Sequence, residues 1–223
     1  MFRLLAAMLT CASSALSALT IDHEITDHRP IFPLTLQLTM TGEIVQGDAL
    51  RLIELLQSLD QHDFREIHVR IDSPGGSLSE GLLLGRLLAA RSEILTTSVG
   101  STADEVGECA SACVLVYLGG DLRYLGDNAS LGVHQFYDGS GEMSADDAID
   151  MAQVLSSEIV TFLNQQRVDL AFFERMTETV RGIDWVPHDL LNEWRVVTGY
   201  VFDEHMEYTN VNGKVGLHMV HES

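Results

Sequence analysis

Positive charge is scarce in this sequence. Its 223 residues include 13 lysines and arginines against 33 aspartates and glutamates, which gives a formal net charge of −20. A field of that sign repels nucleic acids and anionic membrane surfaces, so neither is an expected partner. Lysine is almost absent, because Lys214, close to the C-terminus, is the sole one. A catalytic base in the interior of the chain is therefore expected to be another residue type.

Cysteines and metal-binding patterns are also few. The chain has three cysteines and neither an HExxH motif nor a cysteine-pair zinc pattern, so no metal or other cofactor is expected. Cys11 lies in the N-terminal segment, which leaves Cys109 and Cys113 as an even pair. Residues four apart at a helix start can have Cα atoms ~6 Å apart, within the range that a disulfide tolerates. We expect a disulfide here, with two packed, reduced thiols as the alternative.

The N-terminal apolar stretch is short of the ~20 residues that a membrane-spanning helix needs. Arg3 supplies a positive start, leucines and alanines follow, and residues 12–18 are mostly small. This pattern is typical of a cleaved secretory signal peptide. We therefore predict a signal peptide over residues 1–18, and a mature protein in the periplasm that has no membrane association once the signal is removed.

The rest of the chain, residues 19–223, is predicted to be a single domain with one core, since no repeat or linker divides it. Its order of strands and helices predicts an α/β fold with a mostly parallel sheet. From residue 200 onward no clear periodicity is present. Alternating apolar residues predict strands at 34–40 and 67–71, and a short Thr/Val-rich run predicts another at 94–99. Helical spacing predicts helices at 48–56, 78–90, 144–167, 169–180 and 187–194.

Three short motifs carry the candidate chemistry. Residues 71–77, Ile-Asp-Ser-Pro-Gly-Gly-Ser, join a strand to a helix, where glycines let backbone N–H groups approach a developing oxyanion. Ser111 stands between two alanines where an apolar helix is predicted to begin, and a tight turn there exposes a hydroxyl beside the Ala112 N–H. His134 follows, within a short apolar segment that is predicted to be a strand. Taken singly, each motif fits an ordinary turn, a small packing residue or a structural histidine equally well.

Read together and in this order, the three motifs resemble the proteolytic subunit of the Clp protease, ClpP, over about residues 35–198. The Cys-Ala-Ser-Ala-Cys segment is most similar to that of periplasmic ClpP-like proteins. The resemblance implies a ClpP/crotonase-like spiral of repeated ββα units and a serine endopeptidase. It also implies that Ser111 is the nucleophile, His134 the general base, and the Gly76 and Ala112 N–H groups the oxyanion donors, with Gly75 supporting the turn.

The third member of the implied triad is an aspartate just before the last short helix. Asp184 fits this position within one residue of slippage, and Asp189 is the alternative. Either could instead cap the helix that follows Pro187. Exported relatives similar to signal peptide peptidase A use a lysine as base, but Lys214 lies outside the matching region, which favours His134.

The activity that the resemblance implies is the hydrolysis of peptide bonds in polypeptide substrates. Two alternatives stay open, namely a catalytically inert ClpP-fold protein that binds peptides as a scaffold, and a crotonase-type thioester enzyme. Relatives assemble through long helices, so a homo-oligomer is expected. Residues 144–167 are the candidate contact, and ordinary cover of the core is the equal alternative.

Overall fold

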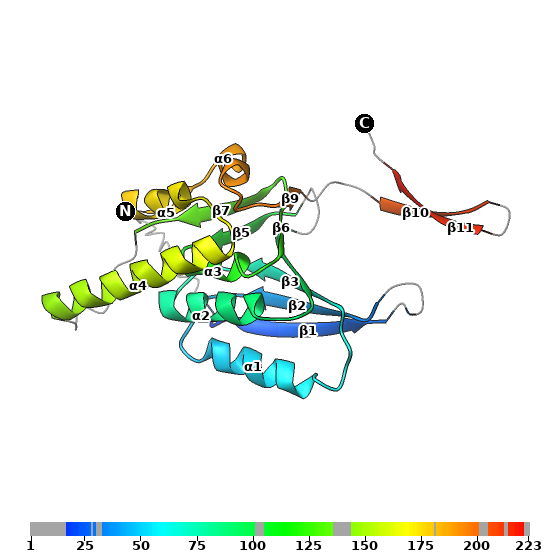
Figure 1. The fold of residues 1–223 in the computed structure, drawn as a ribbon, viewed down its shortest axis with the longest axis horizontal. Coiled ribbons are helices and arrows are strands. Elements are labelled where there is room, and N and C mark those ends of the chain that lie inside the picture. Colours follow the sequence, from blue (N-terminus) through cyan, green and yellow to red (C-terminus); the bar gives the residue numbers. More distant parts are fainter. Residues whose placement is uncertain are drawn as a thin grey trace, which may run out of the picture.

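The computed structural model describes residues 17–27, 29, 33–100, 105–135, 144–180, 182–200, 205–211 and 214–220. The predicted signal peptide falls almost wholly outside these residues. Figure 1 shows the arrangement of the elements. The helices are α1 (Asp48–Ser58), α2 (Leu78–Ala89), α3 (Ala112–Tyr117), α4 (Ala145–Gln165), α5 (Leu170–Glu178) and α6 (His188–Glu193). The strands are β1 (Thr20–Thr26), β2 (Thr35–Thr41), β3 (Glu66–Asp72), β4 (Ile94–Val99), β5 (Gly107–Ala110), β6 (Leu122–Leu125), β7 (Ala129–Val133), β8 (Asp184–Trp185), β9 (Gly199–Tyr200), β10 (His205–Val211) and β11 (Lys214–Val220).

The larger sheet has the strand order β1-β2-β3-β4-β6-β9. β1 pairs antiparallel with β2, and the other neighbours pair in parallel. The apolar residues that alternate along β2 and β3 are buried, because this face of the sheet packs into the core. The predicted α/β fold with a mostly parallel sheet is confirmed.

A smaller sheet, with the order β5-β7-β8, carries the candidate site. β5 and β7 are parallel, and β8 runs antiparallel to β7. Ser73, just past the end of β3, bridges Cys109 of β5, through bonds from the Ser73 N–H to the Glu108 carbonyl (2.8 Å) and from the Ala110 N–H to the Ser73 carbonyl (3.0 Å). The Ser-Pro-Gly-Gly turn is thereby joined directly to the strand that leads into Ser111.

Helix α3 lies in the interior of the molecule. Every one of its residues is buried, and it lies beside α2, as Figure 1 shows. Because a helix buried all round cannot shift without disturbing the core, the residue that precedes it is held firmly.

Two features differ from the sequence expectations. The segment after residue 200, for which no regular structure was expected, contains the antiparallel pair β10 and β11. His134 directly follows β7 and does not lie within the strand. Among the described residues, no helix has the length and apolar character needed to cross a membrane.

Candidate active site

Ser111 occupies a sharp turn between β5 and α3. Its backbone angles are φ 57° and ψ −124°, a left-handed conformation that a residue with a side chain rarely adopts. The Ser111 N–H donates to the Gly132 carbonyl of β7 at 2.8 Å, which fixes the turn to the neighbouring strand. Ser111 remains partly exposed while the helix behind it is buried. A strained strand-to-helix turn of this kind can leave a hydroxyl exposed at its tip.

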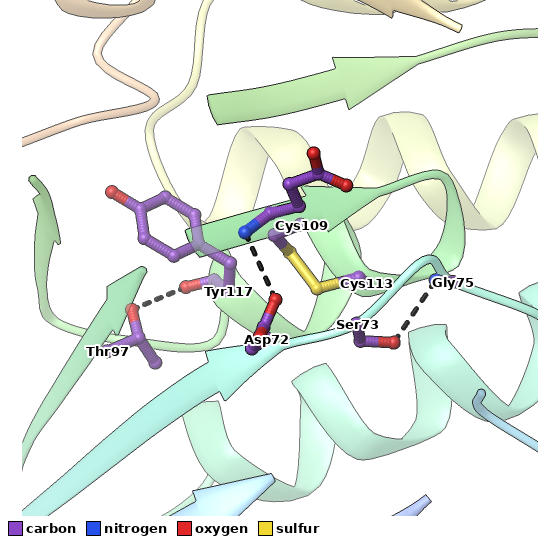
Figure 2. The surroundings of a disulfide bond; sticks show 8 residues. Asp72, Ser73, Gly75, Thr97, Cys109, Cys113 and Tyr117 are labelled. Atoms are coloured by element: carbon purple, nitrogen blue, oxygen red, sulfur yellow. Dashed lines mark hydrogen bonds between the residues drawn. A yellow bond between two sulfur atoms is a disulfide. The ribbon is translucent and has the colours of Figure 1, made fainter. Parts of the chain in front are cut away.

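A disulfide spans this turn. Cys109 in β5 and Cys113 in α3 are bonded, with their Cα atoms 5.3 Å apart, as the sequence led us to expect. Figure 2 shows the bond between strand and helix, with the Ser73–Gly75 hydrogen bond nearby. Both cysteines are buried. The bond therefore links the two segments whose relative position sets the Ser111 backbone.

The glycine turn lies against Ser111. The Gly75 N–H donates to the Ser73 hydroxyl at 3.1 Å, and Gly75 has a φ of 96°. A Cβ atom at Gly75 would lie 2.8 Å from the Ser111 Cβ and 3.1 Å from the Ala112 nitrogen. Any side chain at this position would push the serine turn away, so glycine is required by the close approach as well as by the backbone angle.

Two backbone N–H groups at this point, those of Gly76 and Ala112, donate to no acceptor among the described residues. Gly76 has a φ of 136° and bridges Ile44, but the bridge uses the Gly75 carbonyl (2.7 Å) and the Ser77 N–H (2.8 Å). The Gly76 N–H therefore takes no part in it. Ala112 is the first residue of α3, so its N–H has no acceptor within the helix. Gly75, whose N–H is already engaged, supports the turn.

His134 emerges beside Ser111 because β5 and β7 are parallel neighbours. Ala110 pairs with Gly132, so the serine and the histidine each follow the carboxyl end of an adjacent strand. The His134 Nδ1 lies 2.7 Å from the Gln135 carbonyl oxygen. Since a carbonyl only accepts, Nδ1 carries a hydrogen, and in the neutral form of the ring the lone pair that a general base needs is therefore on Nε2. Among the described residues, no hydrogen bond joins the Ser111 hydroxyl to His134, and catalytic contacts commonly tighten only with substrate bound.

Asp184 lies near His134 but is engaged elsewhere. In β8 it pairs with Val133, the residue before the histidine. Both of its carboxylate oxygens accept from Arg175 of α5: Oδ1 from Nη2 at 3.0 Å and Oδ2 from Nε. The hydrogen bond and the charge of Asp184 raise the pKa of Arg175. Asp189 is exposed in the first turn of α6 and makes no hydrogen bond with a described residue.

The chain thus brings the Gly75–Gly76 turn against Ser111 and places His134 just after the neighbouring strand. Sequence reasoning missed Ile44 and Gly132, which fix the two turns, and Arg175, which engages Asp184. None of these has a local motif, because each acts through a tertiary contact. Within the described part of the chain, no group of three or more histidine, cysteine or acidic side chains is arranged to hold a metal ion.

The comparisons with known proteins identify the family of the chain. The model of the Clp protease family matches residues 30–166, which is more than half of the chain. The chain therefore belongs to the Clp protease family. This is a family of peptidases, and that general activity is supported here. No curated protein matches the chain in sequence.

Solved structures share the fold at low sequence identity. A mutant of the membrane-bound stomatin-specific protease 1510-N has a TM-score of 0.57 at 14% identity, over 74% of this chain and 76% of that one. ClpP1 from Listeria monocytogenes has a TM-score of 0.55 at 20% identity, over 74% and 89%. The ClpP catalytic domain from Plasmodium falciparum has a TM-score of 0.51 at 20% identity, over 71% and 80%. At these identities the likeness concerns the fold alone.

Proposed function

We propose that this protein is an exported serine peptidase in which Ser111 is the nucleophile and His134 the general base. The observation that carries the proposal is the strained Ser111 turn, which lies against Gly75, the residue before Gly76, and one strand away from His134. A nucleophile, a base and oxyanion donors converge there, as acyl transfer requires.

In the proposed reaction, His134 Nε2 takes the hydroxyl proton as the Ser111 oxygen attacks the peptide carbonyl carbon. The carbonyl oxygen becomes an oxyanion, which the two backbone N–H groups stabilise. His134 then returns the proton to the amine that leaves when the C–N bond breaks. Water, deprotonated by the same histidine, hydrolyses the acyl-enzyme and restores the serine.

Polypeptide substrates are supported by apolar side chains beside the site. Trp185 is 43% exposed and Ile183 is 37% exposed. Both lie against Gly132, whose carbonyl accepts from Ser111, since a Cβ atom there would collide with their side chains. Exposed apolar surface next to a nucleophile suits the side chains of an unfolded chain.

Export is supported by the N-terminal sequence and by the Cys109–Cys113 disulfide. Disulfides of this structural kind persist in oxidising compartments such as the bacterial periplasm. We therefore place the mature protein in the periplasm. Fractionation of cells that express the full chain tests this, because recovery of the uncleaved chain in the cytoplasm would contradict it.

A homo-oligomer is part of the same proposal, with α4 as the contact. Figure 1 shows the first half of α4 projecting beyond the rest of the chain. Ile149 and Val154 are each 55% exposed there, and Met151 is 47% exposed. A second copy of this helix would cover such residues. Ile149→Glu should reduce the mass measured by light scattering, and an unchanged mass would exclude this contact.

The peptidase proposal is tested by hydrolysis of an unfolded, fluorescently labelled polypeptide. Wild-type protein should cleave it, and Ser111→Ala should not. A histidine base works only when neutral, so kcat/KM should rise with pH between about 5 and 8. A flat profile, or full activity of His134→Ala, would exclude the histidine as base.

An inert peptide-binding scaffold is the second candidate. It is favoured by two observations: no hydrogen bond joins Ser111 to His134 among the described residues, and the Asp184 carboxylate is taken by Arg175. Peptide binding by fluorescence anisotropy, without turnover and without serine modification, would support the scaffold over the peptidase. The thioester alternative has no comparable observation in its favour.

A further inference from the structure

We propose that an open cavity at the ends of α4 and α6 binds a small oxyanion with two negative charges, of the phosphate or dicarboxylate class. The cavity has a volume of about 660 Å³, which suits a small ligand together with water. Its lining comes from the end of α4, the segment after α6 and the start of β6, so it is a different place from the Ser111 turn. The inference goes beyond the proposed peptidase function and does not depend on it.

The lining of this cavity is positively charged, although the protein as a whole is strongly negative. Three arginines border it, Arg123, Arg167 and Arg195, against the one carboxylate of Asp121. That carboxylate is partly engaged, because its Oδ2 accepts from the Leu95 N–H at 3.0 Å. At physiological ionic strength the field of distant acidic residues is screened within about 8 Å, so the local arginines decide which ions enter.

The buried Arg123 joins the two helix ends that carry the other arginines. Its Nη2 donates both to the Gln166 carbonyl (3.4 Å), directly before Arg167, and to the carbonyl of Arg195 (2.8 Å). Carbonyls at helix ends repel anions, and here Arg123 supplies them with donors. The side chains of Arg167 and Arg195 are exposed and make no hydrogen bond or ion pair with a described residue. Their guanidinium groups are therefore available to a ligand.

Both exposed arginines stand where the backbone favours glycine. The φ angle is 59° at Arg167 and 57° at Arg195, and each residue directly follows the C-cap of its helix. In each case the next N–H donates back to a carbonyl of the last helical turn, from Val168 to Leu163 (2.9 Å) and from Val196 to Leu191 (2.8 Å). This helix-ending motif usually has glycine at the left-handed position, because a side chain there costs free energy.

Two arginines at such positions around one cavity indicate a use for the side chains other than folding. A guanidinium fork binds two oxygens of a carboxylate or a phosphate, and two available forks match an anion with two charges. The ordinary alternative is that each arginine only complements the negative end of its helix dipole. The two explanations differ in what glycine at these positions should do to stability.

Nitrogen-15 NMR of the arginine Nε–H groups tests binding directly. The full chain is titrated with inorganic phosphate and separately with succinate, at an ionic strength kept constant with sodium chloride. We expect saturable shifts of the Arg167 and Arg195 signals. Saturation with one anion only identifies the class of ligand, and saturation with both shows that two charges on oxygen suffice. No saturable shift with either anion, or a Kd weaker than about 10 mM for both, would overturn the proposal.

The variants Arg167→Gly and Arg195→Gly separate binding from folding, because glycine suits the backbone but lacks the guanidinium. We expect each to weaken the Kd by at least about 10-fold, the effect of one lost hydrogen bond to a charged group. Without added anion, each should melt at or above the wild-type temperature.

Arg65→Gln is the matched control. It changes the net charge by the same amount, but Arg65 is exposed in another cavity, beside Asp63 and Glu93, so its Kd should equal that of the wild type. Equal weakening by this control would reduce the effect to general electrostatics and contradict the proposal. Glycine variants that melt below the wild type and bind as tightly would assign the arginines to the helix ends alone. None of these measurements involves turnover, so failure of the peptidase proposal leaves them unaffected.

Discussion

Arg123 is the buried polar residue outside the candidate site whose removal we predict to lower the free energy of unfolding most. Its side chain is 3% exposed and donates to carbonyls that follow the ends of three helices. The acceptors are Gly120 after α3 (2.9 Å), Gln166 after α4 (3.4 Å), and Arg195 (2.8 Å) and Val196 (2.8 Å) after α6. These carbonyls lie in the segments just after the helices, where no regular element supplies a donor, and this one guanidinium satisfies all four of them.

The cost of Arg123→Met can be worked out from these contacts. Each buried acceptor left without a donor costs about 1–3 kcal/mol. The bonds to Val196 and Gly120 are buried, whereas those to Gln166 and Arg195 are partly exposed and border an open cavity of about 660 Å³, where water can replace the donor. The two buried bonds give a loss of about 2–6 kcal/mol, a large fraction of the 5–15 kcal/mol typical of a folded domain.

Urea denaturation of wild type, Arg123→Met and Arg195→Met tests this value. The side chain of Arg195 borders the same cavity but is exposed and makes no hydrogen bond with a described residue. Its replacement should change the free energy of unfolding by no more than about 0.5 kcal/mol. Equal stabilities for the two variants would refute the assignment of Arg123 as the group that holds the helix ends.

Three further predictions concern residues around the site. Tyr117→Phe should raise the free energy of unfolding by about 1 kcal/mol, because the buried hydroxyl has no hydrogen-bond partner among the described residues. Burial also raises the pKa of this hydroxyl. A lower melting temperature for the variant than for the wild type would contradict this prediction. Gly76→Ala should abolish peptide hydrolysis, because the added Cβ would collide with the Ile44 carbonyl. Gly182 also has a positive φ but lies in open space, so Gly182→Ala should retain activity in the same assay. Mild reduction of the Cys109–Cys113 bond should lower serine reactivity more than the melting temperature, and peptide mapping that finds two free thiols in the oxidised protein would exclude the bond.

The sequence predicts those elements whose burial follows a regular period. β2 and β3 are found where alternating apolar residues place them, and β4 is found at the predicted Thr/Val-rich run. α2 ends within one residue of its predicted end. β1 was missed because it is an edge strand with mostly exposed or half-buried residues, so its sequence carries no alternation.

The candidate site likewise has features that the sequence predicts and features that it does not. Ser111 and the glycine turn were predictable because strained turns require particular residue types nearby in the chain. The ion pair of Asp184 with Arg175 was not, because it depends on how α5 packs against β8. The spacing that suggested Asp184 as a triad member describes its distance along the chain and carries no information on the direction of its side chain.

The most direct test of the central claim is covalent labelling of Ser111. Purified protein, with its disulfide intact, is treated with a fluorophosphonate and digested, and the modified peptide is identified by mass spectrometry. We predict one phosphonylated serine, Ser111, no labelling of a folded Ser111→Ala variant, and strongly reduced labelling of His134→Ala. Equal labelling of the Ser111→Ala variant, or none of the wild type, would contradict the assignment of Ser111 as the nucleophile.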